Sequence, residues 1–446
     1  MGTSDQAPLG VLLITDVFPP ASGGSGWSTY YLGKALAERG HKVRVLRPRY
    51  GLRVGRPVLH GNEYGGLPVE EALVPGAPRW LVKLRIGRAW EEREARRILT
   101  RRAMQLARRG SAQVFHAQHK VSAVAASTAA RRMRARGYAV PAVATVRDYW
   151  PLCPVSTRLF PARGGQPAEC ADCHRFPAYW RCASQGWRGA IDPALDLARY
   201  LTTRRAAQSL ASCDTVIAVS RYVREELVRS KRVSADRVVV VPNLVDLASV
   251  ERDASGPWPL NDISPEEPFL LFAGKLEHNK GVNLLPTLVA RSGANLPLVV
   301  AGDGGLEGSL RERARAQGLD FRFVSWIENE SIIRLMRAAR VLVFPSAWQE
   351  PLSRVLLEGC AAGAAVAALD TGGTSDILTH MESGWLARDL DDLAQGVAAL
   401  AADDDLNTRV RQGARAKAEE SFASDGVAAQ VELIYRDAMS RAEAAR

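Results

Sequence analysis

The sequence predicts an α/β protein built from doubly wound, mainly parallel sheets, and two observations carry this prediction. Apolar runs of the kind found in buried strands end in loops and are followed by helical patterns, as at 9–15, 41–46 and 269–273. This order of strand, loop, helix and strand, repeated along the chain, is typical of doubly wound sheets. The second observation is the length, because 446 residues suffice for two or three domains with separate cores.

The composition indicates a soluble globular protein, with 47% hydrophobic and 24% charged residues. No apolar run reaches the roughly 18 residues that span a bilayer, and the start MGTSDQAPLG lacks the features of a signal peptide. We therefore expect a cytoplasmic protein. The net charge of +11 favours anionic partners, which include nucleotide phosphates, anionic lipid and nucleic acid.

The stretch FPSAWQEPLSRVLLEGCAAG at 344–363 combines a strand end, a turn and a helix. Glu350 precedes the helix, and Glu358 lies about two turns inside it, so the two carboxylates can grip separate parts of one elongated ligand. The first helical turn, at Leu352 and Ser353, offers backbone N–H groups and a positive dipole end, which suit phosphate or sugar oxygens. Ser353 can also cap the helix. An ordinary strand–turn–helix with a solvated glutamate is the alternative.

This E-x7-E motif resembles the donor-binding motif of retaining glycosyltransferases of the GT-B type, family 4, and further motifs extend the resemblance over nearly the whole chain. The resemblance implies two Rossmann-like domains facing a central cleft. In this chain a Cys- and aromatic-rich insertion interrupts the first. It implies a UDP- or GDP-linked sugar donor, retention at the anomeric carbon and no catalytic metal. We expect the acceptor domain at 1–250 (insertion about 149–190), a linker at 251–267, the donor domain at 268–425, and a helix at 426–446 that crosses back.

Two lysines in the segment GKLEHNKG follow the predicted strand at 269–273. The resemblance implies that Lys275 and Lys280 grip the donor diphosphate, where two cations would neutralise the departing diphosphate. It also places Glu350 on the sugar hydroxyls and Glu358 on the ribose. The other donor-binding residues that it implies are Gly23, Gly24, Gly274, Gly302 and Asp303. Surface lysines and a flexible glycine loop at 23–26 are the alternatives.

His116 and His119 end another predicted strand, where doubly wound folds place ligands. Members of the family commonly carry histidines here, near the acceptor, although a structural role is the alternative. The family often has His-Asp at the next strand end, whereas this chain has Arg147 and Asp148. An arginine stays protonated and cannot act as a base. It could instead stabilise negative charge or hold Asp148.

The insertion contains four of the six cysteines within 30 residues: Cys153, Cys170, Cys173 and Cys182. A structural zinc bound by all four thiolates is one interpretation, and disulfides or free thiols are the others. Because the insertion interrupts the first domain beside the acceptor side, we expect it to help select the acceptor.

The segment 79–110 has eleven Lys and Arg residues against three Glu, a net charge of +8. A solvated basic helix is one interpretation. Peripheral contact with an anionic membrane at the inner face, with Trp80 and Trp90 as anchors, is the other. Nucleic acid is not expected, because no basic groove interleaved with aromatic residues is visible.

The sequence therefore predicts a retaining glycosyltransferase that acts on a glycan, a lipid-linked acceptor or a small molecule. Two alternatives stay open. A GT-B epimerase would isomerise a nucleotide sugar without any acceptor, and a non-catalytic protein would only bind it. The fold alone does not choose the base, the sugar or the acceptor.

Overall fold

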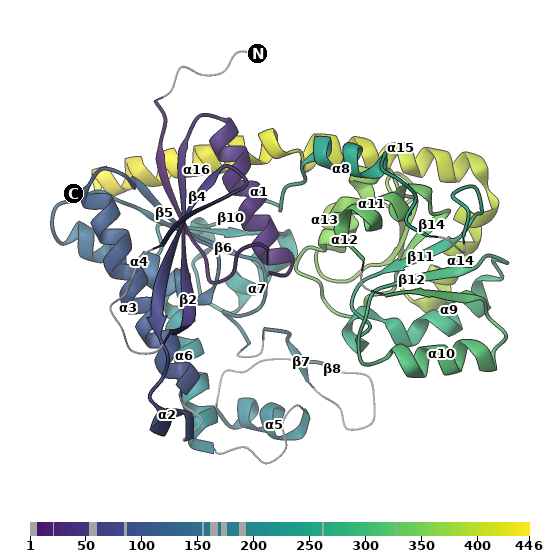
Figure 1. The fold of residues 1–446 in the computed structure, drawn as a ribbon, viewed down its shortest axis with the longest axis horizontal. Helices are drawn as coiled ribbons and strands as arrows, with labels where there is room; N and C mark the ends of the chain where they lie inside the picture. Colours follow the sequence, from purple (N-terminus) through teal and green to yellow (C-terminus); the bar gives the residue numbers. More distant parts are fainter. Residues whose placement is uncertain are drawn as a thin grey trace. The chain divides into compact units, whose positions relative to one another are not determined.

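The computed structural model describes residues 7–20, 22–52, 60–83, 87–153, 156–160, 168–170, 176–186, 193–260, 263–325 and 327–446. The chain forms two compact units (Figure 1). The N-terminal unit comprises Met1–Val241 and Val427–Arg446, and the C-terminal unit comprises Pro242–Gly426. Each unit is built around its own sheet. The stretch suggested as a linker contains part of a helix, α8 (Leu247–Ala254), which belongs to the C-terminal unit.

The N-terminal unit has an eight-stranded sheet in the order β10-β9-β6-β5-β1-β2-β4-β3. All neighbours pair in parallel except β3 and β4. The strands are β1 (Gly10–Ile14), β2 (Lys42–Leu52), β3 (His60–Tyr64), β4 (Leu67–Pro75), β5 (Val114–Ala117), β6 (Ala142–Val146), β9 (Thr215–Ala218) and β10 (Val238–Val240). Strand β1 is apolar and buried along its whole length, as expected for a parallel strand covered on both faces.

Helices flank this sheet on both sides (Figure 1). They are α1 (Gly24–Glu38), α2 (Arg79–Lys83), α3 (Gly87–Arg108), α4 (Lys120–Arg134), α6 (Pro193–Leu210), α7 (Arg221–Arg229) and α16 (Ser424–Ala444). The insertion supplies the short hairpin strands β7 (Leu159–Phe160) and β8 (Ala168–Glu169), and then α5 (Phe176–Gly186). An ion pair between Arg158 at the start of this hairpin and Glu226 of α7 ties the insertion to the unit.

The C-terminal unit has a six-stranded parallel sheet in the order β13-β12-β11-β14-β15-β16. Its strands are β11 (Leu270–Ala273), β12 (Leu298–Ala301), β13 (Phe321–Val324), β14 (Val341–Phe344), β15 (Val366–Leu369) and β16 (Trp385–Ala387). Its other helices are α9 (Leu285–Ser292), α10 (Glu307–Ala316), α11 (Asn329–Ala338), α12 (Arg354–Ala362), α13 (Thr374–Ile377), α14 (Leu390–Ala402) and α15 (Asp404–Ser421). Leucines and valines of these strands and of α9 and α14 form one core. Burying each contributes roughly 1.5–3 kcal/mol.

Helix α16 is fixed to the N-terminal unit by a buried carboxylate. Glu432 accepts hydrogen bonds from Arg39 at 3.1 Å and from Arg436 at 2.7 Å, and His41 Nε2 lies 3.2 Å away. Burial alone would raise the pKa of Glu432, but these cationic and polar partners hold it at about 2. The carboxylate therefore stays charged, and it holds α16 against the end of α1 and the start of β2.

A second anchor of α16 lies entirely in the core. The ring of Tyr435 is fully buried, and its hydroxyl lies 2.6 Å from His116 Nδ1 on β5. The other nitrogen of His116 lies 2.7 Å from Thr145 Oγ1 on β6. This chain of polar contacts joins the terminal helix to two central strands.

Within the described ranges, no helix is both long enough and apolar enough to cross a bilayer.

Replacing Tyr435 by Phe is expected to destabilise the N-terminal unit, because it leaves Nδ1 of the buried His116 without a partner. An unsatisfied buried polar group costs about 1–3 kcal/mol. In a unit of this size that corresponds to a fall of roughly 2–10 °C in the thermal midpoint, measurable by calorimetry. Tyr138→Phe is the matched control, because this tyrosine is exposed. Equal midpoints for both variants would contradict the anchor.

Candidate active site

The order of strands in the C-terminal unit defines where a ligand site is expected. The chain runs from β11 outward to β12 and β13, and then returns to the other side of β11 to form β14. In doubly wound sheets, ligands bind outside the carboxyl ends of the strands at such a switch point. The loops that follow β11 and β14 carry Lys280 and Glu350, so these two residues meet there.

Lys280 and Glu350 form an ion pair at this switch point. The side chain of Glu350 is buried, and it also accepts a hydrogen bond of 3.2 Å from Ser346. The ammonium group of Lys280 lies 5.2 Å from the ring centroid of Trp348, within the range of a cation–π contact. About a quarter of the Lys280 side chain is exposed, so its ammonium group can contact a ligand while it also neutralises the charge of Glu350.

Glycines hold the backbone on both sides of this pair. Gly281 has φ +70°, and a Cβ added to it would lie 1.8 Å from the carbonyl oxygen of Pro345. Gly372 has φ +58° and lies close to the backbone of Glu350. A Cβ added to Gly372 would lie 2.3 Å from the backbone carbonyl oxygen of Glu350. The next amide, of Gly373, donates to that same oxygen at 2.7 Å. The loops after β11 and β15 thus fix both members of the ion pair through backbone contacts.

Glu358 lies on the second turn of α12 and is buried. Arg354 Nε lies 2.8 Å from its Oε1, and the amide of Asn329 donates to the same oxygen at 3.4 Å. Both contacts orient the carboxylate. Ser353 occupies the N-cap position, as expected, but its side chain makes no capping hydrogen bond. Leu352 and Ser353 are both buried beside the start of the helix.

The other residues of the C-terminal unit that were expected to bind the donor lie at the same edge of the sheet. A Cβ on Gly302 would lie 2.0 Å from the carbonyl oxygen of Gly274, so the loops after β11 and β12 touch backbone to backbone. Lys275 and Asp303 are exposed on these loops. Gly23 and Gly24 belong to the N-terminal unit instead, where they open α1 and are exposed.

The N-terminal sheet has its own switch point, between β1 and β5. The loops after these strands bring Thr15 and Asp16 to His119 and the start of α4. Both oxygens of Asp16 accept backbone N–H groups of α4, from Val121 and Ser122, at 2.8 Å. The sequence analysis did not identify Thr15 or Asp16. The signal that could have found them is a polar pair directly after the first apolar run.

The surroundings of His119 define its tautomer. Thr15 Oγ1 donates to the carbonyl of Val17 at 2.6 Å, so it can only accept from His119 Nδ1, 3.1 Å away. The proton therefore sits on Nδ1, and Nε2 carries the lone pair. Burial and the nearby cation of Arg147 lower the pKa of His119 to about 3. Nε2 is shielded from solvent and bonds to none of the described residues.

His116 is placed differently from the sequence prediction. Its side chain has no exposed surface, and Tyr435 and Thr145 occupy both ring nitrogens. Burial, helped by Arg147, lowers its pKa well below the usual range. This geometry favours a structural role for His116 over the predicted catalytic one.

Arg147 and Asp148 follow β6, next to the same switch point. Arg147 donates to Gln118, at the end of β5. Burial raises the pKa of Asp148 to about 6, although the amide of Trp150 donates to its carboxylate at 2.7 Å. Burial likewise raises the pKa of Asp16 to about 6. The edge thus gathers two carboxyls that titrate near neutrality, a fixed cation and a neutral imidazole.

Three of the four cysteines of the insertion lie in described ranges, and Cys173 lies outside them. Cys153 and Cys182 are buried, and Cys170 is half-buried. Burial, together with the nearby thiols of Cys153 and Cys170, raises the pKa of Cys182 to about 11. Among the described side chains, no group of three or more His, Cys, Asp or Glu is arranged to hold a metal ion. The four-cysteine zinc site therefore stays a prediction.

Gly281→Ala tests whether the backbone of the lysine loop builds the donor side. The added Cβ cannot fit against Pro345, so Lys280 should move away from Glu350. Gly293→Ala is the matched control, because Gly293 has a similar φ of +63° but faces open space. It should cost only the left-handed strain of about 1–2 kcal/mol. UDP or GDP should raise the thermal midpoint of the control but hardly that of Gly281→Ala. Equal shifts in both would contradict this assignment.

Two family models match the chain, one for each unit. The model described as Glycosyltransferase Family 4 matches residues 22–249, and the model described as Glycosyl transferases group 1 matches residues 260–417. Among solved structures, HepE of Anabaena in complex with UDP has a TM-score of 0.65 at 16% identity, covering 96% of this chain and 100% of that one. Sucrose-phosphate synthase of Thermosynechococcus elongatus has a TM-score of 0.64 at 18% identity, covering 97% and 99%. At these identities the likeness shows the fold, which is GT-B.

Curated relatives match over about half of this chain. A D-inositol 3-phosphate glycosyltransferase of Xylanimonas cellulosilytica is 31% identical over 249 residues, covering 52% of this chain and 59% of the relative. An alpha-maltose-1-phosphate synthase of Mycolicibacterium smegmatis is 29% identical, covering 51% and 64%. O-antigen chain mannosyltransferase C of Escherichia coli is 29% identical, covering 48% and 58%. The chain thus spans less than two thirds of each relative. With both units matched, the chain belongs to the group 1, family 4 glycosyltransferases of GT-B fold.

Proposed function

We propose that this protein is a cytoplasmic retaining glycosyltransferase that moves a hexosyl group from a UDP- or GDP-linked sugar to a glycan, a lipid-linked acceptor or a small molecule. The observation that carries the proposal is the ion pair between Lys280 and the buried Glu350 at the switch point of the C-terminal sheet. The names of the relatives support transfer to phosphorylated or glycan acceptors, and the UDP complexes of HepE support a uridine donor.

Each end of the donor has a matching group in the C-terminal unit. Lys280 and the exposed Lys275 would neutralise the diphosphate, together with the N–H groups of the first turn of α12. Glu358, whose carboxylate is oriented by Arg354 and Asn329, would accept the ribose hydroxyls. Gly274 and Gly302 themselves carry no side chain, so a ligand could approach the main chain closely there.

Retention follows, in this proposal, from attack on the same face that the diphosphate leaves. The acceptor oxygen bonds to the anomeric carbon as the bond from that carbon to the phosphate oxygen breaks. The acceptor proton passes to the departing oxygen. Because Glu350 is paired with Lys280, its charge is already compensated, and we assign it to the sugar hydroxyls rather than to nucleophilic attack. The lysines stabilise the growing negative charge on the diphosphate, and no catalytic metal is needed.

The acceptor is assigned to the switch point of the N-terminal sheet. His119 Nε2, fixed as a neutral acceptor by the Thr15 hydrogen bond, would orient the acceptor hydroxyl. Asp16 and Asp148 would bind its other hydroxyls, and Arg147 would bind a negatively charged acceptor group. The insertion that carries Cys153 and Cys182 would help select the acceptor.

The first test compares Glu358→Gln and Glu350→Gln with wild-type protein. UDP- and GDP-hexoses are screened by thermal shift, and the best donor is used for transfer or slow hydrolysis. Losing a charge-assisted hydrogen bond costs roughly 1.5–3 kcal/mol, so Glu358→Gln should weaken donor binding about tenfold to a hundredfold. Glu350→Gln should chiefly lower turnover. The matched control is Glu312→Gln, because this glutamate of α10 is exposed.

Several outcomes would contradict the proposal or a part of it. Variants at both sites with wild-type kinetics would refute the donor site. Isomerisation of the donor without an acceptor would indicate an epimerase, and binding without transfer or hydrolysis would indicate a non-catalytic protein. Product NMR decides retention, and prompt loss of activity in EDTA that Mg²⁺ restores would refute the metal-free mechanism.

A further inference from the structure

Helix α3 presents a row of arginines on its exposed side. Ala95, Leu99 and Ala103 are fully buried on the opposite side, which fixes the rotation of the helix. Residues three or four positions apart lie on one face of a helix, so the exposed positions form a single stripe. We call this the α3 arginine stripe: Arg93, Arg97, Arg101 and Arg108. At 1.5 Å per residue it extends over about 22 Å.

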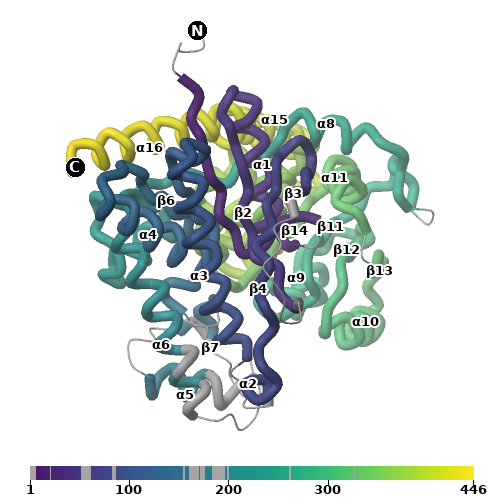
Figure 2. Tube along the Cα trace, turned by 60° about the vertical axis from the view of Figure 1, so that its left-hand side comes forward, coloured from purple at the N-terminus to yellow at the C-terminus, as the bar shows by residue number. Residues whose placement is uncertain are grey.

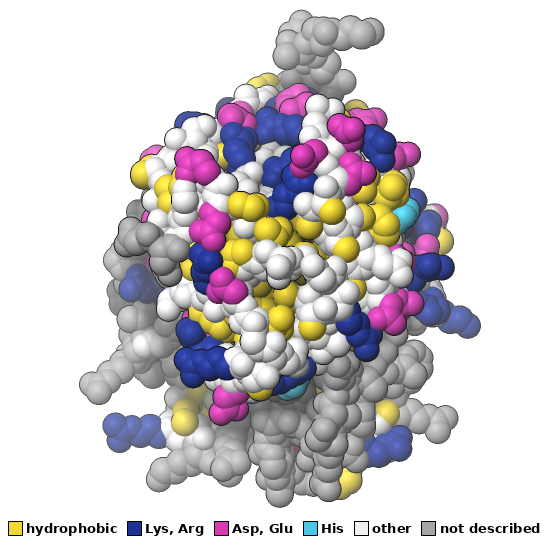
Figure 3. All heavy atoms as spheres, turned by 90° about the vertical axis from the view of Figure 1, so that its right-hand side faces the viewer, with side chains coloured by type: hydrophobic (Ala, Val, Ile, Leu, Met, Phe, Trp, Pro, Cys, Tyr) yellow, Lys and Arg dark blue, Asp and Glu magenta, His cyan; other side chains and the backbone are white. Residues whose placement is uncertain are grey.

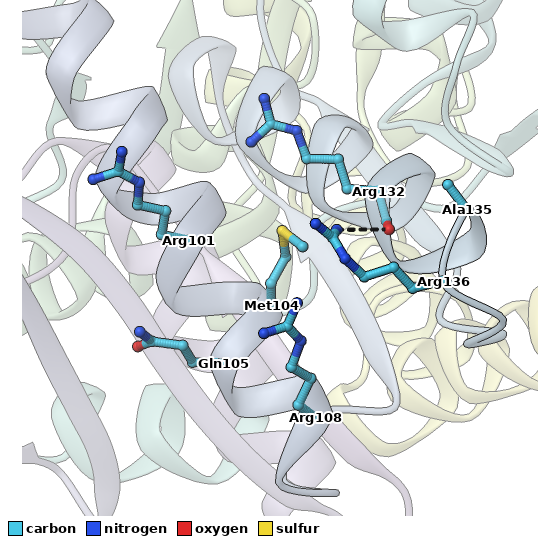
Figure 4. A pocket seen from close by; sticks show the side chains of 7 residues that line it. All are labelled: Arg101, Met104, Gln105, Arg108, Arg132, Ala135 and Arg136. Carbon is cyan, nitrogen blue, oxygen red and sulfur yellow. Dashed lines mark hydrogen bonds between the residues drawn. The ribbon is translucent and has the colours of Figure 1, made fainter.

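A hollow of about 630 Å³ lies at the C-terminal end of this stripe, between α3 and the end of α4 (Figure 4). Four arginines and three other residues line it: Arg101, Met104, Gln105, Arg108, Arg132, Ala135 and Arg136. The guanidinium group of Arg136 is oriented by a hydrogen bond of 3.0 Å that it donates to the backbone carbonyl of Arg132. Within the described part of the chain, none of these four guanidinium groups has a carboxylate partner. Their mutual repulsion is therefore uncompensated until an anion binds.

Large apolar side chains are exposed at the other end of α3. On α2, Trp80 is 61% exposed and Val82 is 58% exposed. The amide of Ala77 donates to Glu91 of α3 at 3.0 Å, which fixes this short helix against the start of α3 (Figure 2). Trp90, the second anchor expected from the sequence, is half-buried. Exposed tryptophan beside a basic helix suits the boundary between lipid headgroups and acyl chains.

We propose that this face, formed by α2, the α3 arginine stripe and the end of α4, docks on a bilayer that contains anionic lipids. Trp80 and Val82 insert at headgroup depth, and the arginines of the stripe and of the hollow bind lipid phosphates. Charge complementarity selects the partner, because the arginines of the hollow have no carboxylate partner among the described residues. The face shown in Figure 3, which is a different one, carries basic and acidic side chains interspersed. A nucleic acid would instead favour aromatic rings between the arginines, whereas Trp80 lies at one end of the stripe. Docking needs no sugar donor, so this proposal can be tested independently of the transfer reaction.

Sedimentation with vesicles tests this proposal. Full-length protein is mixed with vesicles of phosphatidylcholine alone or with about 30% phosphatidylglycerol, the range in which anionic lipid gives a marked surface potential. Binding should require the anionic lipid and should weaken as salt is raised. Arg101→Glu with Arg108→Glu should weaken binding about thirtyfold or more. Trp80→Ser should weaken it about fivefold to tenfold through lost insertion.

Matched controls come from exposed positions elsewhere. Arg315→Glu with Arg409→Glu makes the same change of charge on α10 and α15, and Leu433→Ser removes an apolar side chain that is 66% exposed on α16. These variants should bind within about threefold of wild type, allowing for the smaller net charge. Equal binding to both vesicle types, or equal losses in the controls, would overturn the proposal. It would also fail if a short single-stranded DNA bound as tightly as the vesicles and lost the same affinity in the stripe variant.

Discussion

The ion pair between Lys280 and Glu350 is the interaction on which the rest of the candidate site depends. A buried carboxylate left without its partner costs roughly 3–5 kcal/mol, so the pair is held together whenever the C-terminal unit is folded. Three loops arrange it. Gly281 turns beneath Lys280 against Pro345, and Gly372 and Gly373 hold the backbone of Glu350. The candidate site is thus built mainly from main-chain contacts at strand ends, and it presents two charged side chains.

Both units place polar residues according to the same topological rule. In each sheet the order of strands reverses beside the first strand, and polar side chains from two loops meet at that point. In the C-terminal unit the meeting residues are charged, which suits a diphosphate. In the N-terminal unit they are a neutral imidazole and carboxyls with raised pKa values, which suit the hydroxyls of an acceptor. This division agrees with membership of a family that transfers sugars between two substrates.

Local patterns in the sequence were sufficient for the fold class, the family and the positions of Lys280 and Glu350 at strand ends. They failed where a role depends on distant residues. His116 is bonded to Tyr435, 319 positions away, which no spacing reveals. The β3–β4 hairpin was not predicted. Two adjacent glutamates, Glu70 and Glu71, are unusual in a buried strand, and here they are buried because Arg102 and Arg47 pair with them. The tautomer of His119 likewise needs Thr15, which lies 104 positions earlier.

A crystal structure of the protein with UDP or GDP, whichever raises the thermal midpoint more, tests the central claim most directly. We expect diphosphate oxygens at about 2.7–3.2 Å from Lys280 Nζ and from the first N–H groups of α12, with the ribose hydroxyls on Glu358. A nucleotide bound only at the β1–β5 switch point of the N-terminal unit, with the Lys280–Glu350 pair untouched, would contradict it.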